Sequence, residues 1–167
     1  IDGYVNMDSA TVMRNTSQSA NMALSIDPDN AEAHAALAQV AQREFRYKEA
    51  TDLYQRASAL NPSFATAHQW LGNSLGEMGD PEAGLVSLQK AWSLDPRSRI
   101  IGANLALQLA NLDRSQEALD VLSQIMAFAP DFPDTYELLM HFAIIGGDCA
   151  SALESGNRLA KLLNKPA

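Results

Sequence analysis

The chain has 167 residues, of which 47% are hydrophobic, and 20 acidic against 12 basic residues give it a formal net charge of −8. This composition is typical of a folded globular protein, and the acidic balance argues against a surface that follows the phosphates of a nucleic acid. No run of about 18 apolar residues occurs, and the N-terminus lacks the basic and apolar regions of a signal peptide, so we expect no membrane span and a cytoplasmic location.

The first predicted element is a helix from about residue 10 to residue 27. Ala20 and Ala23 lie there at places where small residues recur later in the chain. We interpret residues 1–30 as a partial, degenerate repeat whose first helix is largely missing. The missing initiator methionine suggests a fragment of a longer protein.

Residues 31–64 predict a pair of helices, at 31–44 and 47–60. Apolar residues recur in both segments with a helical period. In the first segment they are Ala33, Leu37, Val40 and Ala41, and in the second they are Ala50, Leu53, Tyr54, Ala57 and Leu60. Each helix of about 14 residues would be roughly 21 Å long.

The same unit recurs at 65–98, at 99–132 and at 133–167. Its marker is a proline that follows the second helix of a unit, found at Pro28, Pro62, Pro96 and Pro130, each 34 residues after the one before. Proline ends a helix and excludes the preceding residue from helical geometry, so it marks the turn into the next unit. In the last repeat Asn164 stands at the proline place, so the register loosens there.

Two of the helix starts carry specific signals. Asp80 is the expected N-cap of a helix that has Pro81 at its first position. Gly147 and Asp148 occupy the corresponding point two units later. The single Cys149 excludes an internal disulfide, and we expect it to be a small buried residue.

Four places of the unit hold similar residues in every copy. They are the seventh place (Leu37, Leu71, Leu105, Leu139), the eighth (Ala38, Gly72, Ala106, Met140), the twentieth (Ala50, Gly84, Ala118, Ala152) and the twenty-seventh (Ala57, Ala91, Ile125, Leu159). This pattern resembles the tetratricopeptide repeat over nearly the whole chain. The resemblance implies an all-α fold: a right-handed superhelical solenoid of antiparallel helix pairs, with the first helix of each pair on the concave face.

A concave face of this kind is a binding surface for a peptide or a helix of another protein. We predict as its contact residues the polar and aromatic side chains off the leucine face of the first helices: Gln39, Arg43, Gln69, Trp70, Asn73, Glu77, Asn104, Asn111 and His141. The amides can both donate to and accept from a peptide backbone, and Trp70 is the expected anchor. The alternative is that these side chains only face water.

More specialised sites are not supported. Repeats of this family that capture a C-terminal carboxylate use two asparagines and three basic residues; Asn73 and Asn104 match, but Gln69, Asp134 and Leu138 hold the basic places. His34 and His68 lie 34 residues apart in successive layers, so we interpret them as core or capping residues rather than metal ligands. We expect no cofactor, no metal and no enzyme activity.

Residues 20–130 also resemble the repeat arrays of bacterial proteins in which a winged-helix DNA-binding domain or a nucleotide-cyclase domain precedes the array. That resemblance implies the sensory or protein-interaction region of a bacterial transcription or signalling regulator, with no direct binding of nucleic acid by this region. We expect a protein or peptide partner. A homodimer, or an assembly scaffold without a peptide ligand, is the alternative function.

Overall fold

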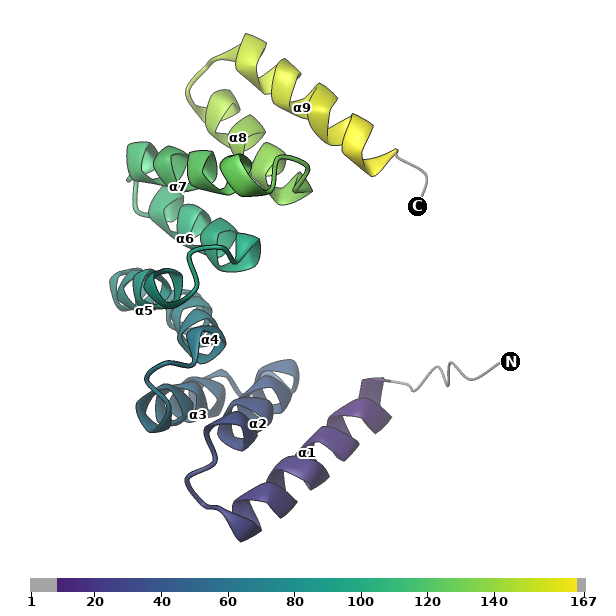
Figure 1. Cartoon of the computed structure of the whole chain (residues 1–167), viewed down its shortest axis with the longest axis vertical. Helices are drawn as coiled ribbons and strands as arrows, with labels where there is room; N and C mark the ends of the chain where they lie inside the picture. Colours follow the sequence, from purple (N-terminus) through teal and green to yellow (C-terminus); the bar gives the residue numbers. More distant parts are fainter. Residues whose placement is uncertain (1–8, 165–167) are drawn as a thin grey trace, which may run out of the picture.

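The structure is a computed structural model that describes residues 9–164. Over these residues the chain forms nine α-helices and no strand (Figure 1), which confirms the all-α prediction. The helices are α1 (Ser9–Ile26), α2 (Ala31–Arg43), α3 (Tyr47–Leu60), α4 (Ala65–Glu77), α5 (Pro81–Leu94), α6 (Arg99–Asn111), α7 (Ser115–Phe128), α8 (Pro133–Ile145) and α9 (Cys149–Leu163). None of these helices is long and apolar enough to cross a membrane.

The helices stack as antiparallel pairs into a curved solenoid. In Figure 1, α2, α4, α6 and α8 lie on the side toward which α1 and α9 turn at the two ends of the array. Most contacts join helices that are neighbours in the chain, but α4 also contacts α6, and α6 contacts α8. The first helices of three successive pairs therefore form a continuous layer on the concave side.

Local signals in the sequence account for where the helices begin. Four N-cap side chains accept a hydrogen bond from the backbone N–H three residues later, which satisfies a donor that the first turn leaves free. They are Asn30, Asp80, Ser98 and Asp148. The predictions for Asp80 and Asp148 are confirmed, and Pro81 is the first residue of α5. Cys149, the first residue of α9, is exposed, so the prediction that it is buried was wrong.

The turn inside each of the four complete pairs has one residue in the left-handed backbone region. The four residues occupy the same place of the unit: Phe45 (φ 62°), Gly79 (φ 87°), Asp113 (φ 58°) and Gly147 (φ 73°). Glycine has this conformation without strain, and aspartate tolerates it. Phe45 therefore carries a conformational cost that its counterparts at Gly79 and Gly147 avoid.

The two helices of a pair approach closely where both carry small residues. Ala38 and Ala106 at the eighth place, and Ala50 and Ala118 at the twentieth, have no exposed surface. A Cβ atom built on Gly72 would lie 2.7 Å from Cγ of Leu88 and 2.8 Å from the carbonyl oxygen of Gly84. The recurring small residues therefore set the distance between the paired helices.

The side chain at the fourth place of the unit binds the proline loop that precedes its own helix. Nε2 of His34 lies 3.0 Å from the carbonyl oxygen of Pro28, and Nε2 of His68 lies 3.1 Å from that of Pro62. The Tyr136 hydroxyl donates to the carbonyl of Pro130 over 2.7 Å. The two histidines are structural residues, as predicted. Because a carbonyl only accepts, their Nε2 atoms carry the hydrogen.

The last pair, α8 and α9, reverses the usual order of sizes. In the earlier pairs a small residue at the eighth place faces a large one at the twenty-fourth, as Gly72 faces Leu88. In the last pair Met140 is at the eighth place and Gly156 at the twenty-fourth, and a Cβ atom on Gly156 would lie 3.2 Å from the sulfur of Met140. No residue of α9 is buried, because no other described helix covers its outer side.

Candidate partner-binding groove

Two adjoining cavities follow the concave layer formed by α4, α6 and α8. The α4–α6 cavity has a volume of about 470 Å³ and is lined by Asn73, Gly76, Glu77, Pro81, Asn104, Leu107, Gln108 and Asn111. The α6–α8 cavity has a volume of about 440 Å³ and is lined by Ala103, Asn104, Leu107, Asp134, Glu137, Leu138, Met140, His141 and Ile144. Asn104 and Leu107 line both cavities, so the two form one groove across three helices.

Amide side chains dominate the α4–α6 cavity. Gln108 is buried, and its Nε2 donates to the carbonyl of Pro81 over 2.8 Å, which ties α6 to the start of α5. Its Oε1 lies against Gly76, where a Cβ atom would approach it to 3.0 Å. A buried polar side chain with a fixed partner is an ordered part of the cavity wall. Around it, Asn73, Asn104 and Asn111 supply further donors and acceptors.

Glu77, at the rim of this cavity, is connected to the core of the first complete pair. Its Oε2 accepts a hydrogen bond of 3.1 Å from Nε2 of Gln42. Oε1 of Gln42 in turn accepts one of 3.0 Å from the Tyr54 hydroxyl. Tyr54 is fully buried, and burial, together with the negative charge of Glu77, raises the pKa of Tyr54 to about 12. The hydrogen bonds from Tyr54 through Gln42 thus hold the side chain of Glu77 in place.

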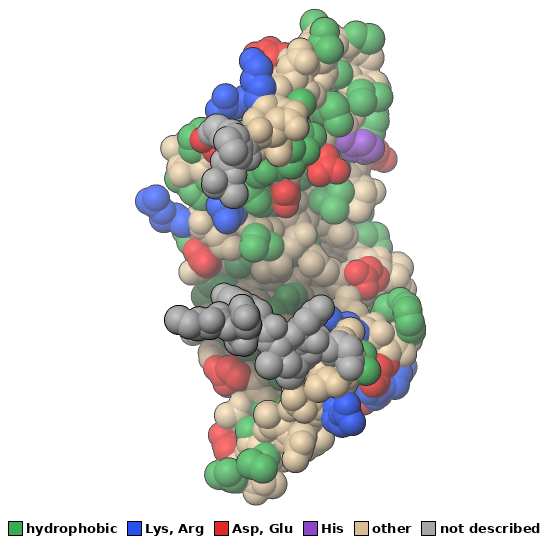
Figure 2. Space-filling model, turned by 90° about the vertical axis from the view of Figure 1, so that its right-hand side faces the viewer, with side chains coloured by type: hydrophobic (Ala, Val, Ile, Leu, Met, Phe, Trp, Pro, Cys, Tyr) green, Lys and Arg blue, Asp and Glu red, His purple; other side chains and the backbone are tan. Residues whose placement is uncertain are grey.

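The α6–α8 cavity combines apolar surface with negative charge. Leu107 is 44% exposed and Ile144 is 61% exposed, so both present apolar surface to this cavity. Asp134 and Glu137 lie one turn apart on α8, and no Lys or Arg belongs to the described residues that line this cavity. Figure 2, which looks onto the side toward which the two ends turn, shows acidic and hydrophobic side chains over its upper part, with Lys and Arg side chains toward the left edge of that part.

The structure brings five of the nine predicted contact residues into the groove. Asn73, Glu77, Asn104 and Asn111 line the α4–α6 cavity, and Asn104 and His141 line the α6–α8 cavity. Gln39 and Arg43 belong to α2 and line neither cavity.

The two remaining predicted residues, Gln69 and Trp70, line neither cavity; Gln69 is buried, and Trp70 is partly buried. Gln69 is only 8% exposed. The ring of Trp70 packs against those of Tyr54 and Phe64, with centroid distances of 5.8 Å and 6.3 Å. The partly buried indole also packs against the cluster of Ala35, Ala57 and Ala67. At the same place of the next unit stands Asn104, which does line the groove.

Sequence reasoning missed Gln108, Met140 and Ile144 as groove residues. Ile144 lies on α8 one turn after His141, which was predicted as a contact residue. The sequence signal for Ile144 as a groove residue was an apolar side chain that lies off the leucine face of its helix. Gln108 had no such signal, because its role depends on a contact with Pro81 in another helix.

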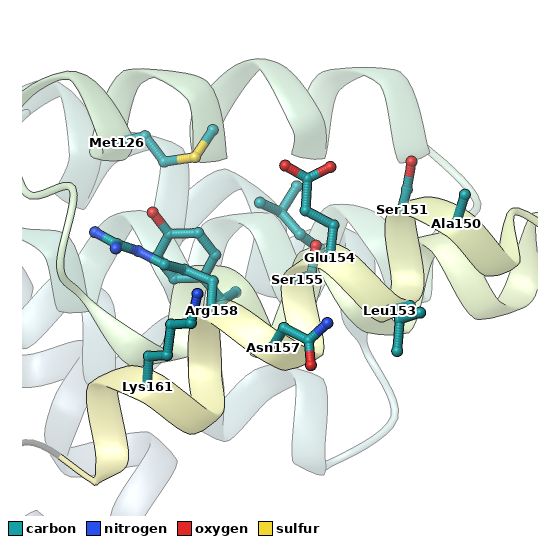
Figure 3. A pocket seen from close by; sticks show the side chains of 11 residues that line it. Met126, Ala150, Ser151, Leu153, Glu154, Ser155, Asn157, Arg158 and Lys161 are labelled. Atoms are coloured by element: carbon teal, nitrogen blue, oxygen red, sulfur yellow. The ribbon is translucent and has the colours of Figure 1, made fainter.

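A larger cavity of about 900 Å³ lies between α7, α8 and α9 (Figure 3). Arg158 of α9 donates to Oδ1 of Asp131 over 2.6 Å and lies 5.8 Å from the centre of the Tyr136 ring. Figure 3 shows Ser151 and Glu154 on one side of α9, and Leu153 and Asn157 on the other. The cavity therefore belongs to the exposed end of the solenoid and does not continue along the stack.

In the described part of the chain, no three His, Cys, Asp or Glu side chains are grouped so that they could hold a metal ion. Glu117, an exposed acid of α7, is bound by Arg114 over 2.7 Å, and this contact lowers the pKa of Glu117.

Comparison with known proteins gives the following matches. A family model described as a TPR repeat matches residues 46–79. The solved structure of MamA is similar with a TM-score of 0.79 and 17% identity, covering 95% of this chain and 96% of that one. The structure of YrrB, described as a TPR protein with an unusual peptide-binding site, has a TM-score of 0.74 and 21% identity, covering 92% of this chain and 79% of that one.

The structure of pilF from Pseudomonas aeruginosa is also similar, with a TM-score of 0.79 and 23% identity over 93% of this chain and 72% of that one. Among curated proteins, none matches this sequence. At these levels of identity the solved structures show the fold, which is that of a helical-repeat solenoid.

Proposed function

We propose that this chain, a solenoid of tetratricopeptide repeats, binds a peptide or a helix of a partner protein in the groove along α4, α6 and α8. The observation that carries the proposal is the continuity of the two cavities through Asn104 and Leu107. A solenoid of this type serves as an interaction scaffold rather than as an enzyme. That YrrB, which shares the fold, is described as having a peptide-binding site supports the same interpretation.

The dimensions of the groove suit a short segment. Three parallel layers of helices about 10 Å apart give a span of roughly 20 Å, which about six extended residues would cover. The amides of Asn73, Asn104 and Asn111 can bond to the backbone of such a segment without requiring a charge. Leu107 lies between the two cavities and contributes exposed apolar surface to both.

A peptide-display selection tests this function. Peptides selected on the wild type are expected to lose about tenfold or more in affinity for a variant with Asn104→Ala and Leu107→Ala, because those side chains line both cavities. The matched control is Val86→Ala with Gln89→Ala, two exposed positions of α5 outside the groove. Helical circular dichroism verifies that both variants fold. Selected peptides that bind the groove variant as tightly as the wild type would refute the proposal.

The sequence resemblance over residues 20–130 supports a more specific context: the regulatory region of a larger bacterial transcription or signalling protein in the cytoplasm. The complete coding sequence tests this context. A winged-helix or cyclase domain joined to the array is the expected result, and a different neighbouring domain would contradict it.

Self-association is the alternative function, and exposed apolar side chains at both ends of the array favour it. On α1 they are Met22 and Ile26, and on α9 they are Leu153 and Leu163. Sedimentation velocity of the wild type and of a variant with Leu153→Ser and Leu163→Ser distinguishes this alternative. A dimer that the variant abolishes while leaving peptide binding intact would establish self-association as a separate property.

A further inference from the structure

We propose that the groove selects segments in which Lys or Arg accompanies a bulky apolar side chain, with the apolar residue in the α6–α8 cavity and the cation beside Asp134 and Glu137. This inference rests on the proposed function and adds to it the chemistry of the partner. It concerns the groove defined above and no other part of the surface.

The groove carries negative charge. Its lining includes three carboxylates, Glu77, Asp134 and Glu137, and none of its described lining residues is Lys or Arg. Single exposed ion pairs contribute little, but three charges of one sign along a concave surface act together on an extended ligand. These carboxylates attract a basic segment and repel an acidic one.

The groove also exposes apolar surface beside Asp134 and Glu137. Leu107 and Ile144 are exposed in the α6–α8 cavity, and Leu138 and Met140 line it beside them. The cavity volume of about 440 Å³ accommodates a leucine or phenylalanine side chain, whose burial removes apolar surface on both partners from water. The flexible thioether of Met140 can adapt to either shape.

The two halves of the groove differ in the side chains that line them. In the α4–α6 cavity, amides predominate and Glu77 already accepts a hydrogen bond from Gln42. In the α6–α8 cavity, Asp134 and Glu137 flank apolar side chains. The cationic, apolar part of the ligand therefore belongs over α8, and its neutral part over α4.

The experiment compares synthetic, fluorescein-labelled peptides of about 12 residues, long enough to cross the groove. One combines Lys with Leu, the second replaces each Lys with Glu, and the third keeps Lys but replaces each Leu with Ser. Fluorescence anisotropy is expected to give the Lys/Leu peptide an affinity at least about tenfold higher than that of either other peptide. About 0.5 M NaCl is expected to reduce its advantage over the Glu/Leu peptide, since salt screens exposed charges.

A pair of charge variants separates the groove from the overall acidity of the chain, whose net charge is −8. Asp134→Asn with Glu137→Gln is expected to weaken binding of the Lys/Leu peptide by about five- to tenfold. The control, Glu82→Gln with Asp120→Asn, removes the same charge from exposed positions of α5 and α7 and is expected to change the affinity less than about twofold.

Two results overturn the inference. One is equal or tighter binding of the Glu/Leu peptide, and the other is an equal loss of affinity in the control variant. The Glu/Leu peptide could bind and lose that binding in the variant with Asn104→Ala and Leu107→Ala. This result would refute the preference for Lys or Arg, while the groove would remain the binding site. If every peptide binds the variant with Asn104→Ala and Leu107→Ala as tightly as it binds the wild type, the proposed function itself is refuted.

Discussion

At the scale of single residues, Tyr54 connects the core to the groove. Its buried hydroxyl donates to Gln42, and Gln42 donates to Glu77 at the rim. A buried phenol is hard to ionise because the charge would lose its hydration, and the carboxylate of Glu77 adds repulsion. The pKa of Tyr54 accordingly rises to about 12. The neutral phenol is thus the form that the folded chain stabilises.

This shift predicts how stability depends on pH. The folded-state pKa of about 12 exceeds the value of about 10 in an unfolded chain, so the contribution of Tyr54 is fully present below pH 10 and is lost between pH 10 and pH 12. Relative to a Tyr54→Phe variant, the unfolding free energy of the wild type is expected to fall by about 1.4 kcal/mol between pH 8 and pH 11. Urea denaturation at each pH measures it. Parallel pH profiles of the two proteins would contradict it.

Phe45 and Gly79 give a second prediction at this scale, because they hold the same left-handed turn place. No atom lies within 4 Å of a Cβ built on Gly79, so Gly79→Ala is expected to cost about 1 kcal/mol through backbone conformation alone. Phe45→Gly is expected to leave stability unchanged or to raise it by up to about 1 kcal/mol. Urea denaturation measures both. A loss in Phe45→Gly as large as that in Gly79→Ala would mean that the edge-on contact of Phe45 with Tyr47 outweighs the strain.

At the scale of helices, each pair is held at one crossing by a small residue facing a large one. Three pairs place the small residue on the first helix, as with Gly72 and Leu88, and the α8–α9 pair places it on the second, at Gly156. What matters for packing is therefore the summed volume of the side chains at the eighth and twenty-fourth places, and not the identity of either residue. This explains how Met140 fits at a place that otherwise holds alanine or glycine.

A double-mutant cycle in the α8–α9 pair tests this rule. Gly156→Leu alone is expected to overpack against Met140, with a cost on the order of 1–3 kcal/mol. Met140→Ala alone leaves a void. Together the two changes recreate the arrangement of the earlier pairs, so the destabilisation is expected to be smaller than the sum by at least about 1 kcal/mol. Additive losses in thermal or urea unfolding would show that the two side chains do not share one space.

The helices and their ends were largely predictable, whereas the membership of the groove was only partly so. Proline places and the cap at Asp80 act on their immediate neighbours in the chain, so a local pattern suffices. Trp70 shows the limit: its ring is partly buried against a cluster that includes Ala35, a residue of another helix. Which polar side chain remains accessible depends on such contacts between pairs, and the sequence of one helix does not contain them.

At the scale of the whole molecule, the solenoid lacks a single central core. Each pair depends on its neighbours, and the contact between α7 and α8 is the slightest among successive helices of the described part. No residue of α9 is buried. The α8–α9 pair is therefore expected to open independently of the rest.

Hydrogen exchange measures this difference along the chain. Amides of α9 are expected to exchange at least about tenfold faster than those of α5, since opening one end breaks fewer contacts than opening the middle. A ligand that occupies the α6–α8 cavity is expected to slow exchange in α8, because binding stabilises the state that binds. Equal protection of α5 and α9 would show that the array unfolds as one unit.

The reversed sizes in the last pair limit how such a chain can be lengthened or rearranged by recombination. A crossover inside a turn that joined α6 to α9 would set Ala106 opposite Gly156 and leave a hole, and joining α8 to a copy of α7 would crowd Met140 against Leu122. Crossovers in the proline loops between pairs keep matched volumes together. The helical hairpin, and not the single helix, is therefore the heritable building block of this protein.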